Sequence, residues 1–263
     1  MDHPQLEAVK IVSRLNDQYM ASYHAAFEIN PETARRQLLH GLARRLMLIA
    51  ENTRVIVDIS RPDRVKPLSD SERITASIHL NSFYLHVRGS LDNLAWALTY
   101  QLALLERDSS GEPKNRQDVD LFGPRFLKAL EEKAPALFAA VKPKATWRKE
   151  LADLRDPVAH RIPIYAIPTT LNREEQELYQ RTDAAAKEAF AAMDIELANA
   201  LYDKLTEIGT YKALFAHDFS LPRGVREIYP QVLGDAALLV DLCELIVPVM
   251  RNWGATGAAA GRA

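Results

Sequence analysis

The sequence predicts an all-α protein, a helical bundle with one long central helix. Apolar residues recur at steps of three and four through several long segments, as expected for amphipathic helices. The chain has 263 residues, of which 48% are hydrophobic and only 10 are glycine. These numbers are typical of a chain that buries a substantial core. Strand-like alternation is confined to short stretches in the second half.

Seven segments have helical periodicity and helix start or stop signals. The second long segment begins with Pro31 in its first turn, where a missing N–H costs nothing, and it ends before Pro62. The predicted helices span 4–28, 31–58, 71–106, 124–133, 146–155, 174–208 and 230–250.

The segment 71–106 is expected to be the most buried helix. Phe83, Trp96 and Ala97 widen its apolar stripe, which indicates contacts on more than one side. The stripe consists of Leu80, Tyr84, Val87, Leu91, Leu94, Leu98, Leu102 and Leu105.

A small two-stranded ribbon is predicted after residue 160. The stretch IPIYAIPTT alternates apolar residues and contains two prolines, which restrict it to an edge strand. We expect strands at 162–168 and 214–220. We also expect a helical core at 1–170, a helical extension at 171–253 that packs on this core, and a disordered tail at 254–263.

The composition excludes several classes of protein. The net charge of −2 argues against a globally basic nucleic-acid binder, although it permits a local basic patch. The single cysteine, Cys243, lies in an apolar run and is expected to be a buried hydrophobe in a reducing, cytoplasmic setting. We find no signal peptide or membrane-spanning segment.

Metal and cofactor motifs are also missing from the sequence. None of the seven histidines follows a glutamate by three positions, and there is no His-Glu-x-x-His, Cys-x-x-Cys or P-loop pattern. The sequence therefore predicts neither a metal site nor a cofactor.

The stretch LADLRDPVAHRIPIYAIP, residues 151–168, contains the candidate site. The residue before a proline disfavours the α conformation, so we expect the helix to break at Asp156-Pro157 and a new turn to start there. Arg155 would then approach His160 beside free amide groups, an arrangement suited to a phosphate. The equally spaced Arg35 and His40 lie in a continuous helix that directs them apart.

The region around this motif is locally basic. Residues 142–161 contain six lysines and arginines and three acidic residues. Lys144, Arg148 and Arg161 are candidates for binding a polyanionic substrate. Trp147 has two interpretations: it stacks on a base, or it packs inward while the neighbouring charges form a solvated helix face.

Three residues of the central helix are expected to support the site. His86 and Asn93 are seven positions apart and therefore share a helix face with His79, which is typical of a hydrogen-bonded strip. Asp92 offers a carboxylate with which Arg155 can pair.

These residues also carry a resemblance to a known family. RDPVAH resembles the Arg-Asn/Asp-x3-His signature of the HEPN superfamily (higher eukaryotes and prokaryotes nucleotide-binding), and YLHVRGSLDNLAWAL resembles the central helix of several bacterial branches. The resemblance covers residues 30–165. It implies a HEPN-like helical bundle, usually a dimer, and in many members a metal-independent endoribonuclease of toxin or defence systems, with Arg155, Asp156 and His160 in the site.

Two functions therefore stay open. In the first, a homodimer cleaves RNA: His160 acts as general acid or base, Arg155 stabilises the charge that develops on phosphorus and Asp156 positions them, with an antitoxin or other protein as a further partner. In the second, the chain is a non-catalytic HEPN-like module that binds protein or nucleic acid. Arg155 then pairs with a carboxylate such as Asp92, and His160 holds a corner of the chain.

Overall fold

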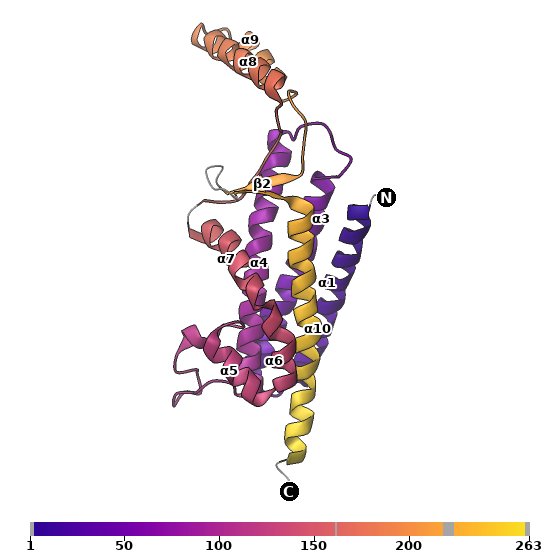
Figure 1. The fold of residues 1–263 in the computed structure, drawn as a ribbon, viewed down its shortest axis with the longest axis vertical. Helices are drawn as coiled ribbons and strands as arrows, with labels where there is room; N and C mark the ends of the chain where they lie inside the picture. The colour runs from indigo at the N-terminus through magenta and orange to yellow at the C-terminus, as the bar shows by residue number, and fades with distance from the viewer. Residues whose placement is uncertain (1–2, 161, 218–223, 261–263) are drawn as a thin grey trace.

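The computed structural model describes residues 3–160, 162–217 and 224–260, with the side chains of 4–155, 162–217 and 224–253. The chain is mainly helical and has one small sheet, which confirms the all-α class (Figure 1). The helices before the sheet are α1 (His3–Glu28), α2 (Glu32–Arg36), η1 (Gln37–Leu42), α3 (Ala43–Ile59), α4 (Asp70–Leu102), η2 (Arg116–Asp118), α5 (Pro124–Lys133), α6 (Pro135–Val141), η3 (Lys142–Lys144) and α7 (Ala145–His160). The remaining elements are β1 (Tyr165–Ala166), α8 (Arg173–Ala191), α9 (Ile195–Leu205), β2 (Leu214–Ala216), β3 (Val225–Glu227) and α10 (Ile228–Ala260).

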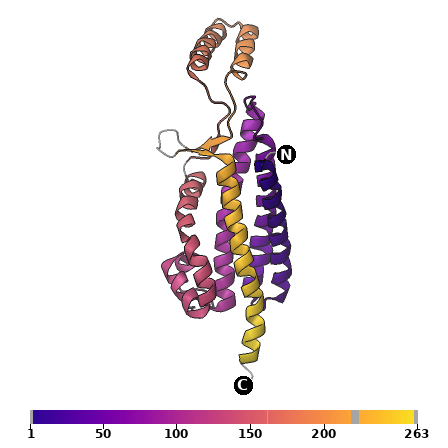
Figure 2. The ribbon, with the colours of Figure 1, turned by 45° about the vertical axis from the view of Figure 1, so that its right-hand side comes forward.

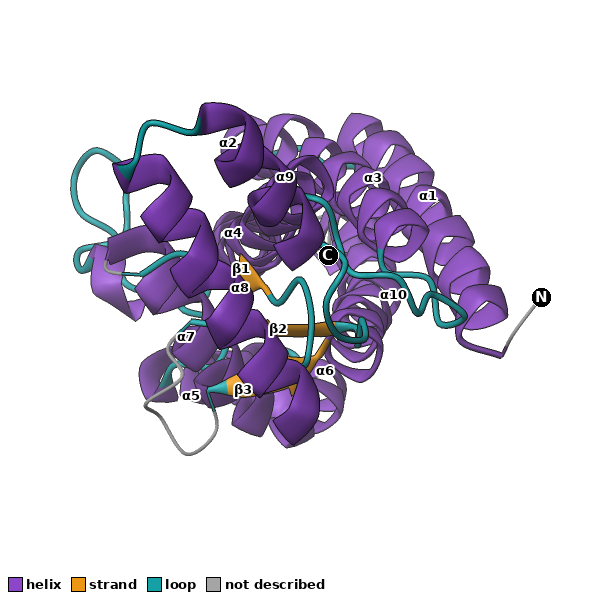
Figure 3. Cartoon of the chain, turned by 90° about the horizontal axis from the view of Figure 1, so that it is seen from above, coloured by secondary structure: helices purple, strands orange, loops and turns teal. Residues whose placement is uncertain are grey.

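Helix α4 lies at the centre of the bundle, as the apolar stripe predicts. Phe83, Tyr84 and Val87 are fully buried, and so are the later stripe positions Leu91 and Leu94. Seen from above, α1 and α3 lie on one side of α4 and α10, and α5 and α7 lie on the other (Figure 3). The second half of α4 is therefore covered on nearly every face, whereas the first half keeps one exposed face.

The predicted end of this helix at residue 106 was wrong. The helix ends at Leu102, because Ala103 adopts the left-handed conformation with φ of 51°. Arg107 donates hydrogen bonds to the carbonyl oxygens of Thr99 and Tyr100, at 3.1 Å each. These bonds satisfy carbonyl groups that lose their helical partners at the C-terminus.

The predicted helix at 31–58 is a continuous helical run of three parts. Its middle part, η1, has π-helical hydrogen bonding over six residues, QLLHGL. A π segment inserts an extra residue into a turn and shifts the helix face that follows. This shift sets which residues of α3 face α4.

The β ribbon is a three-stranded antiparallel sheet in the order β1-β2-β3 (Figure 1). Tyr165 lies opposite Ala216, and Phe215 lies opposite Arg226. The prediction of a strand near 162–168 and another near 214–220 located β1 and β2 but missed β3. Residues 218–220 lie outside the described part of the chain.

Residues 173–205 form a helical arm, and the single helix predicted at 174–208 was wrong. Met193, at the tip, has φ of 61°, and Asp194 caps α9 by accepting a hydrogen bond from the Leu197 N–H at 3.1 Å. These two residues reverse the chain, so α8 and α9 pack on each other. Figures 1 and 2 show this arm projecting from the end of the bundle that carries the sheet.

Helix α10 belongs to the bundle itself. It packs along α1 and α4 and extends beyond the predicted end at residue 250, to Ala260. Leu239, Leu242 and Ile246 are fully buried in the same core as α4. The segment after residue 170 therefore contributes a helix to the central core as well as the arm.

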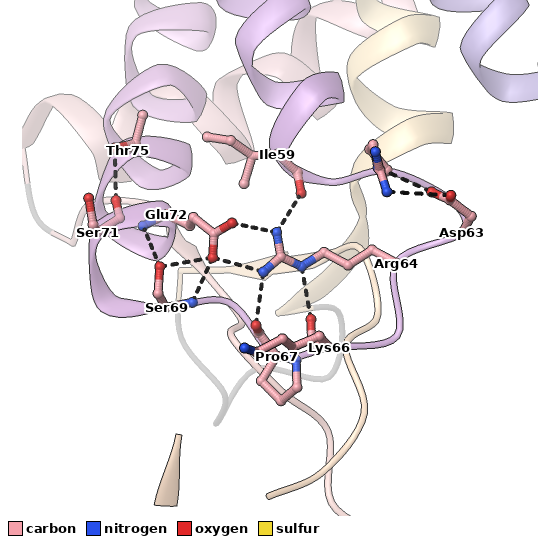
Figure 4. Close-up of polar contacts among 10 residues, drawn as sticks. Ile59, Asp63, Arg64, Lys66, Pro67, Ser69, Ser71, Glu72 and Thr75 are labelled. Atoms are coloured by element: carbon pink, nitrogen blue, oxygen red, sulfur yellow. Dashed lines mark hydrogen bonds and ion pairs between the residues drawn. The ribbon is translucent and has the colours of Figure 1, made fainter. Parts of the chain in front are cut away.

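A partly buried arginine holds the loop before α4 in place. Arg64 donates to both carboxylate oxygens of Glu72, at 2.6 and 2.8 Å, and to the carbonyl oxygens of Lys66 and Pro67 (Figure 4). Glu72 also completes a capping box with Ser69, so the same carboxylate starts the helix and holds the loop. The Arg64 hydrogen bonds lower the pKa of Glu72 to about 2.

We predict that the Arg64–Glu72 pair makes stability depend on pH. The pKa of Glu72 is lowered from 4.5 to about 2 in the folded state. The ionised carboxylate therefore makes its full contribution to the free energy of unfolding above pH 4.5, and this contribution is lost as the pH falls toward 2. The free energy of unfolding can be measured with urea at pH 7 and at pH 3. Its fall between these two pH values should be about 1 kcal/mol smaller in Glu72→Gln than in the wild type, after allowance for solvent screening. Glu51→Gln, which removes an exposed helix pair with Arg54, is the control and should change this difference less. Equal losses in wild type and Glu72→Gln would contradict the prediction.

Candidate functional site

The predicted break at Asp156-Pro157 was wrong, because α7 continues to His160. The buried residues Leu151 and Leu154 anchor α7 in the core, and this packing outweighs the one hydrogen bond that a proline removes. No helix therefore begins at residue 156 to offer free amides to a phosphate. In a continuous helix, positions 155 and 160 lie about 140° apart around the axis.

Arg155 nevertheless lies in a cluster of charges. It is half-buried, and its positive charge acts on Asp92 of α4. Burial raises the pKa of Asp92, while the positive charges of Arg88, Arg155 and Arg45 oppose this rise and Asp120 adds to it. Arg88 forms an ion pair with Asp92 at 3.3 Å. The expected proximity of Arg155 and Asp92 is therefore present.

Arg45 joins this cluster to the two other residues predicted to support the site. Its Nε donates to Asn93 Oδ1 at 3.0 Å, and its Nη1 lies 3.1 Å from His86 Nδ1. Asn93 in turn donates to Gln37 Oε1 at 2.8 Å. Burial and the charge of Arg45 lower the pKa of His86. Neither hydrogen-bond partner of Arg45 is an acid, and its charge also acts on Asp92.

Two glycines make room for these contacts. A Cβ on Gly89 would collide with the Arg45 guanidinium, and a Cβ on Gly41 would collide with the Asn93 side chain. Glycine in a helix interior is unfavourable without such a reason. The sequence analysis missed Arg45, and the signal that could have identified it is this pair of glycines within the helical segments 31–58 and 71–106.

The predicted substrate-binding residues have different environments. Trp147 is buried and donates from Nε1 to Asp235 Oδ1 at 2.7 Å, so its assignment as a base-stacking residue was wrong and the inward-packing interpretation is confirmed. Lys144 pairs with Asp241 at 3.3 Å on the side of α10. Arg148 is half-exposed and pairs with Asp120, which links it to the cluster at Asp92.

The side chains of Asp156, His160 and Arg161 lie outside the described residues. For Asp156 and His160 the structure gives the backbone position, at the C-terminal end of α7. The described part of the cluster is therefore four arginines, Arg45, Arg88, Arg148 and Arg155, around two carboxylates, Asp92 and Asp120.

An open apolar groove lies next to this cluster. It has a volume of about 570 Å³ and runs along the first half of α4. Ile74, Ile78 and Leu85 line it and are 49%, 61% and 40% exposed. His86 lies at one end and Tyr165, from β1, at the other. Exposed aliphatic side chains in a row are typical of a surface that contacts another protein.

Within residues 3–160, 162–217 and 224–260, no set of three His, Cys, Asp or Glu side chains is placed to hold a metal ion. No helix in that part of the chain has both the length and the apolar character needed to cross a membrane. Comparison with protein-family models, curated proteins and solved structures finds no match for this chain.

We predict that the charge of Arg45 adds to the effect of burial in lowering the pKa of His86. Removing the charge in Arg45→Gln should raise the His86 pKa toward its ordinary value of 6.5, measured from the imidazole proton shifts by NMR. Arg45→Lys, which keeps the charge, should retain most of the depression. Arg44→Gln is the neighbouring control, since Arg44 contacts His40 instead. The prediction fails if His86 titrates identically in Arg45→Gln and the wild type.

Proposed function

We propose that the protein is a metal-independent endoribonuclease of the HEPN type that acts as a homodimer. The observation that supports this best is the cluster of four arginines and two carboxylates, which makes one region locally positive in a chain of net charge −2. Guanidinium groups bind phosphate oxygens in pairs, and such contacts position a nucleic-acid backbone.

The proposed chemistry needs three groups at one phosphodiester. A base removes the proton of the ribose 2′-hydroxyl, a cation stabilises the charge on phosphorus and an acid protonates the leaving 5′-oxygen. Arg155 is the cation in this proposal, His160 is the acid or base and Asp156 positions them. Arg88 and Arg45 hold the flanking phosphates, while Asp92 keeps the guanidinium groups in place.

The homodimer supplies what one chain lacks. Positions 155 and 160 lie about 140° apart around the axis of α7, so we expect that one helix does not bring both residues to the same phosphate. A two-fold axis through the groove of Ile74 and Ile78 brings the two α7 C-termini together, since residues 163–165, just after α7, also line that groove. A composite site then contains two copies of each group.

A non-catalytic module is the second candidate, and the action of Arg155 on Asp92 favours it. If Arg155 serves only to neutralise this half-buried carboxylate, then Arg155→Ala and Asp92→Asn should each destabilise the fold. A double-mutant cycle should give a coupling energy of about 1 kcal/mol or more. In the ribonuclease, Arg155→Ala lowers activity and leaves stability nearly unchanged.

We predict RNA cleavage that survives EDTA and leaves 2′,3′-cyclic phosphate ends. His160→Ala and Arg155→Ala should each reduce the single-turnover rate by about 100-fold or more, the usual effect of removing an acid–base group or a charge-stabilising group. His40→Ala is the control, because His40 contacts only Arg44 among the described hydrogen bonds.

His160→Gln and thermal unfolding distinguish lost chemistry from lost folding. A folded His160→Gln dimer that is inactive supports the proposal. The proposal is refuted if the folded, dimeric wild type neither cleaves nor binds any RNA in a varied pool of single-stranded substrates.

We predict that the groove is the dimer interface. Ile78→Asp places a charge in the middle of the apolar surface and should convert the dimer to a monomer at micromolar concentration in light scattering. Val9→Asp, a similarly exposed apolar position on α1, is the matched control and should stay dimeric. A wild-type monomer, or an unchanged mass for Ile78→Asp, would contradict this assignment.

A further inference from the structure

The C-terminal end of α1 carries an exposed aromatic surface, formed by Met20, Tyr23 and Phe27. These side chains are 46%, 38% and 63% exposed. Tyr19, Tyr23 and Phe27 follow one another by one helical turn, with ring centroids 6.4 and 5.1 Å apart. Residues 18–27 contain no acidic residue, no lysine and no arginine. Contiguous exposed apolar patches commonly mark binding surfaces.

The aromatic surface lies on the side of α1 that faces α3. Arg14 pairs with Asp241 and Glu244, which places α10 on one side of α1. Tyr23 follows Arg14 by two and a half helical turns and therefore lies on the opposite side. The other long helix that packs along α1 is α3.

The aromatic surface is also level with the arginine cluster along the bundle. The chain reverses between the end of α1 and the start of α2, with residue 30 in the middle. Tyr23 and Gln37 are equally far from this point, so they lie at about the same height. Gln37 accepts a hydrogen bond from Asn93, the neighbour of Asp92 in the cluster. Packed helices are about 8–10 Å apart, so crossing from α1 over α3 to α4 takes about 20 Å.

The helical run between these two sites is positively charged. Residues 33–50, from α2 into α3, contain four arginines and no acidic residue. Arg36 and Arg44 are exposed, and within the described residues neither forms an ion pair with a carboxylate. Arg45 follows Arg44 directly and turns toward α4, where it contacts Asn93. Positive charge therefore extends from the cluster across α3 to α1.

Single-stranded RNA fits this combination of groups. Cations bind its phosphates, and its bases stack on aromatic rings. The rings of Tyr23 and Phe27 meet edge to face, at 64°, and this contact covers a face of only one of them. Glu28, the acidic residue after Phe27, pairs with Arg251 of α10, which offsets its charge. The run between the sites also contains the π segment η1, and such segments are frequent at functional sites.

We infer that RNA bound at the arginine cluster continues across α3 past Arg44 and Arg36 and stacks its bases on Tyr23 and Phe27. This inference rests on the ribonuclease proposed above, because the cleaved bond lies at the cluster. The span of about 20 Å requires several nucleotides, so the substrate has unpaired bases beyond the cleavage position. A duplex does not fit, since its bases are already stacked on one another.

Two strands with the same number of phosphates test the contribution of the bases. Both are fluorescent 2′-O-methyl oligonucleotides, which resist cleavage because they lack the 2′-hydroxyl; one carries adenine at every position and the other is abasic. Tyr23→Leu with Phe27→Leu keeps both positions apolar and removes the rings. In fluorescence anisotropy this variant should raise the Kd for the adenine strand about tenfold or more. Its Kd for the abasic strand should stay within about twofold.

Two arm residues provide the matched control for the aromatic variant. Phe190→Leu with Tyr202→Leu makes the same changes at side chains that are 58% and 39% exposed, and it should leave both Kd values within about twofold. Phe27→Leu alone should show the same preference with a smaller effect, and it serves as the test if the double variant unfolds.

The arginines should act on both strands alike. Arg36→Gln with Arg44→Gln should weaken binding of the adenine and the abasic strand by similar factors. It should also reduce the slope of log Kd against log salt concentration by about 1.4, or about 0.7 for each phosphate contact. Arg173→Gln with Arg181→Gln, at exposed positions of α8, is the control and should leave the slope unchanged.

The inference is overturned if the aromatic variant binds the adenine strand as tightly as the wild type, or if it loses the same affinity for both strands. A variant with unchanged RNA affinity but a lower mass than the wild type in light scattering would identify the aromatic surface as a protein contact instead. In these cases the ribonuclease proposal still stands. A folded wild type that binds neither strand refutes this inference and counts against the ribonuclease as well.

Discussion

The burial of α4 is the constraint on which the rest of the structure depends. A 33-residue helix with apolar side chains on several faces has no stable orientation against a single neighbour. It needs helices around it, and α3, α7 and α10 provide them. Each fully buried side chain such as Phe83 or Leu91 contributes about 2 kcal/mol, so the surrounding helices are held by the same residues that hold α4.

This arrangement also explains why the polar residues of α4 are grouped. Apolar packing leaves only a narrow part of the α4 surface for polar side chains. His86, Asp92 and Asn93 therefore lie close together there, near charged residues of α3 and α7. Arg45 reaches between the helices because Gly89 leaves room for its guanidinium group. The proposed phosphate-binding cluster is thus a consequence of how tightly α3 approaches α4.

The arm has a different physical basis. Its helices bury few residues, among them Ala186 and Ala198, and most of its apolar side chains stay exposed. An isolated helical hairpin gains little from such packing, so capping residues carry a larger share of its stability: Asn172 forms a capping box with Glu175, and Asp194 caps α9.

Local sequence by itself determined the helical class, the central position of the 71–106 segment and the approximate extent of most helices, because periodicity reports directly which residues must be buried. It also indicated Asp92 as a neighbour of Arg155 and the inward alternative for Trp147. Only the tertiary structure decided that α7 continues through Asp156-Pro157, that the segment 174–208 folds back at Met193, and that Arg45 joins His86 to Asn93. In each case, packing between segments that are far apart in the sequence overrides or supplements a local preference. Proline positions and residue spacing do not contain this information, because they do not show which distant segments contact one another.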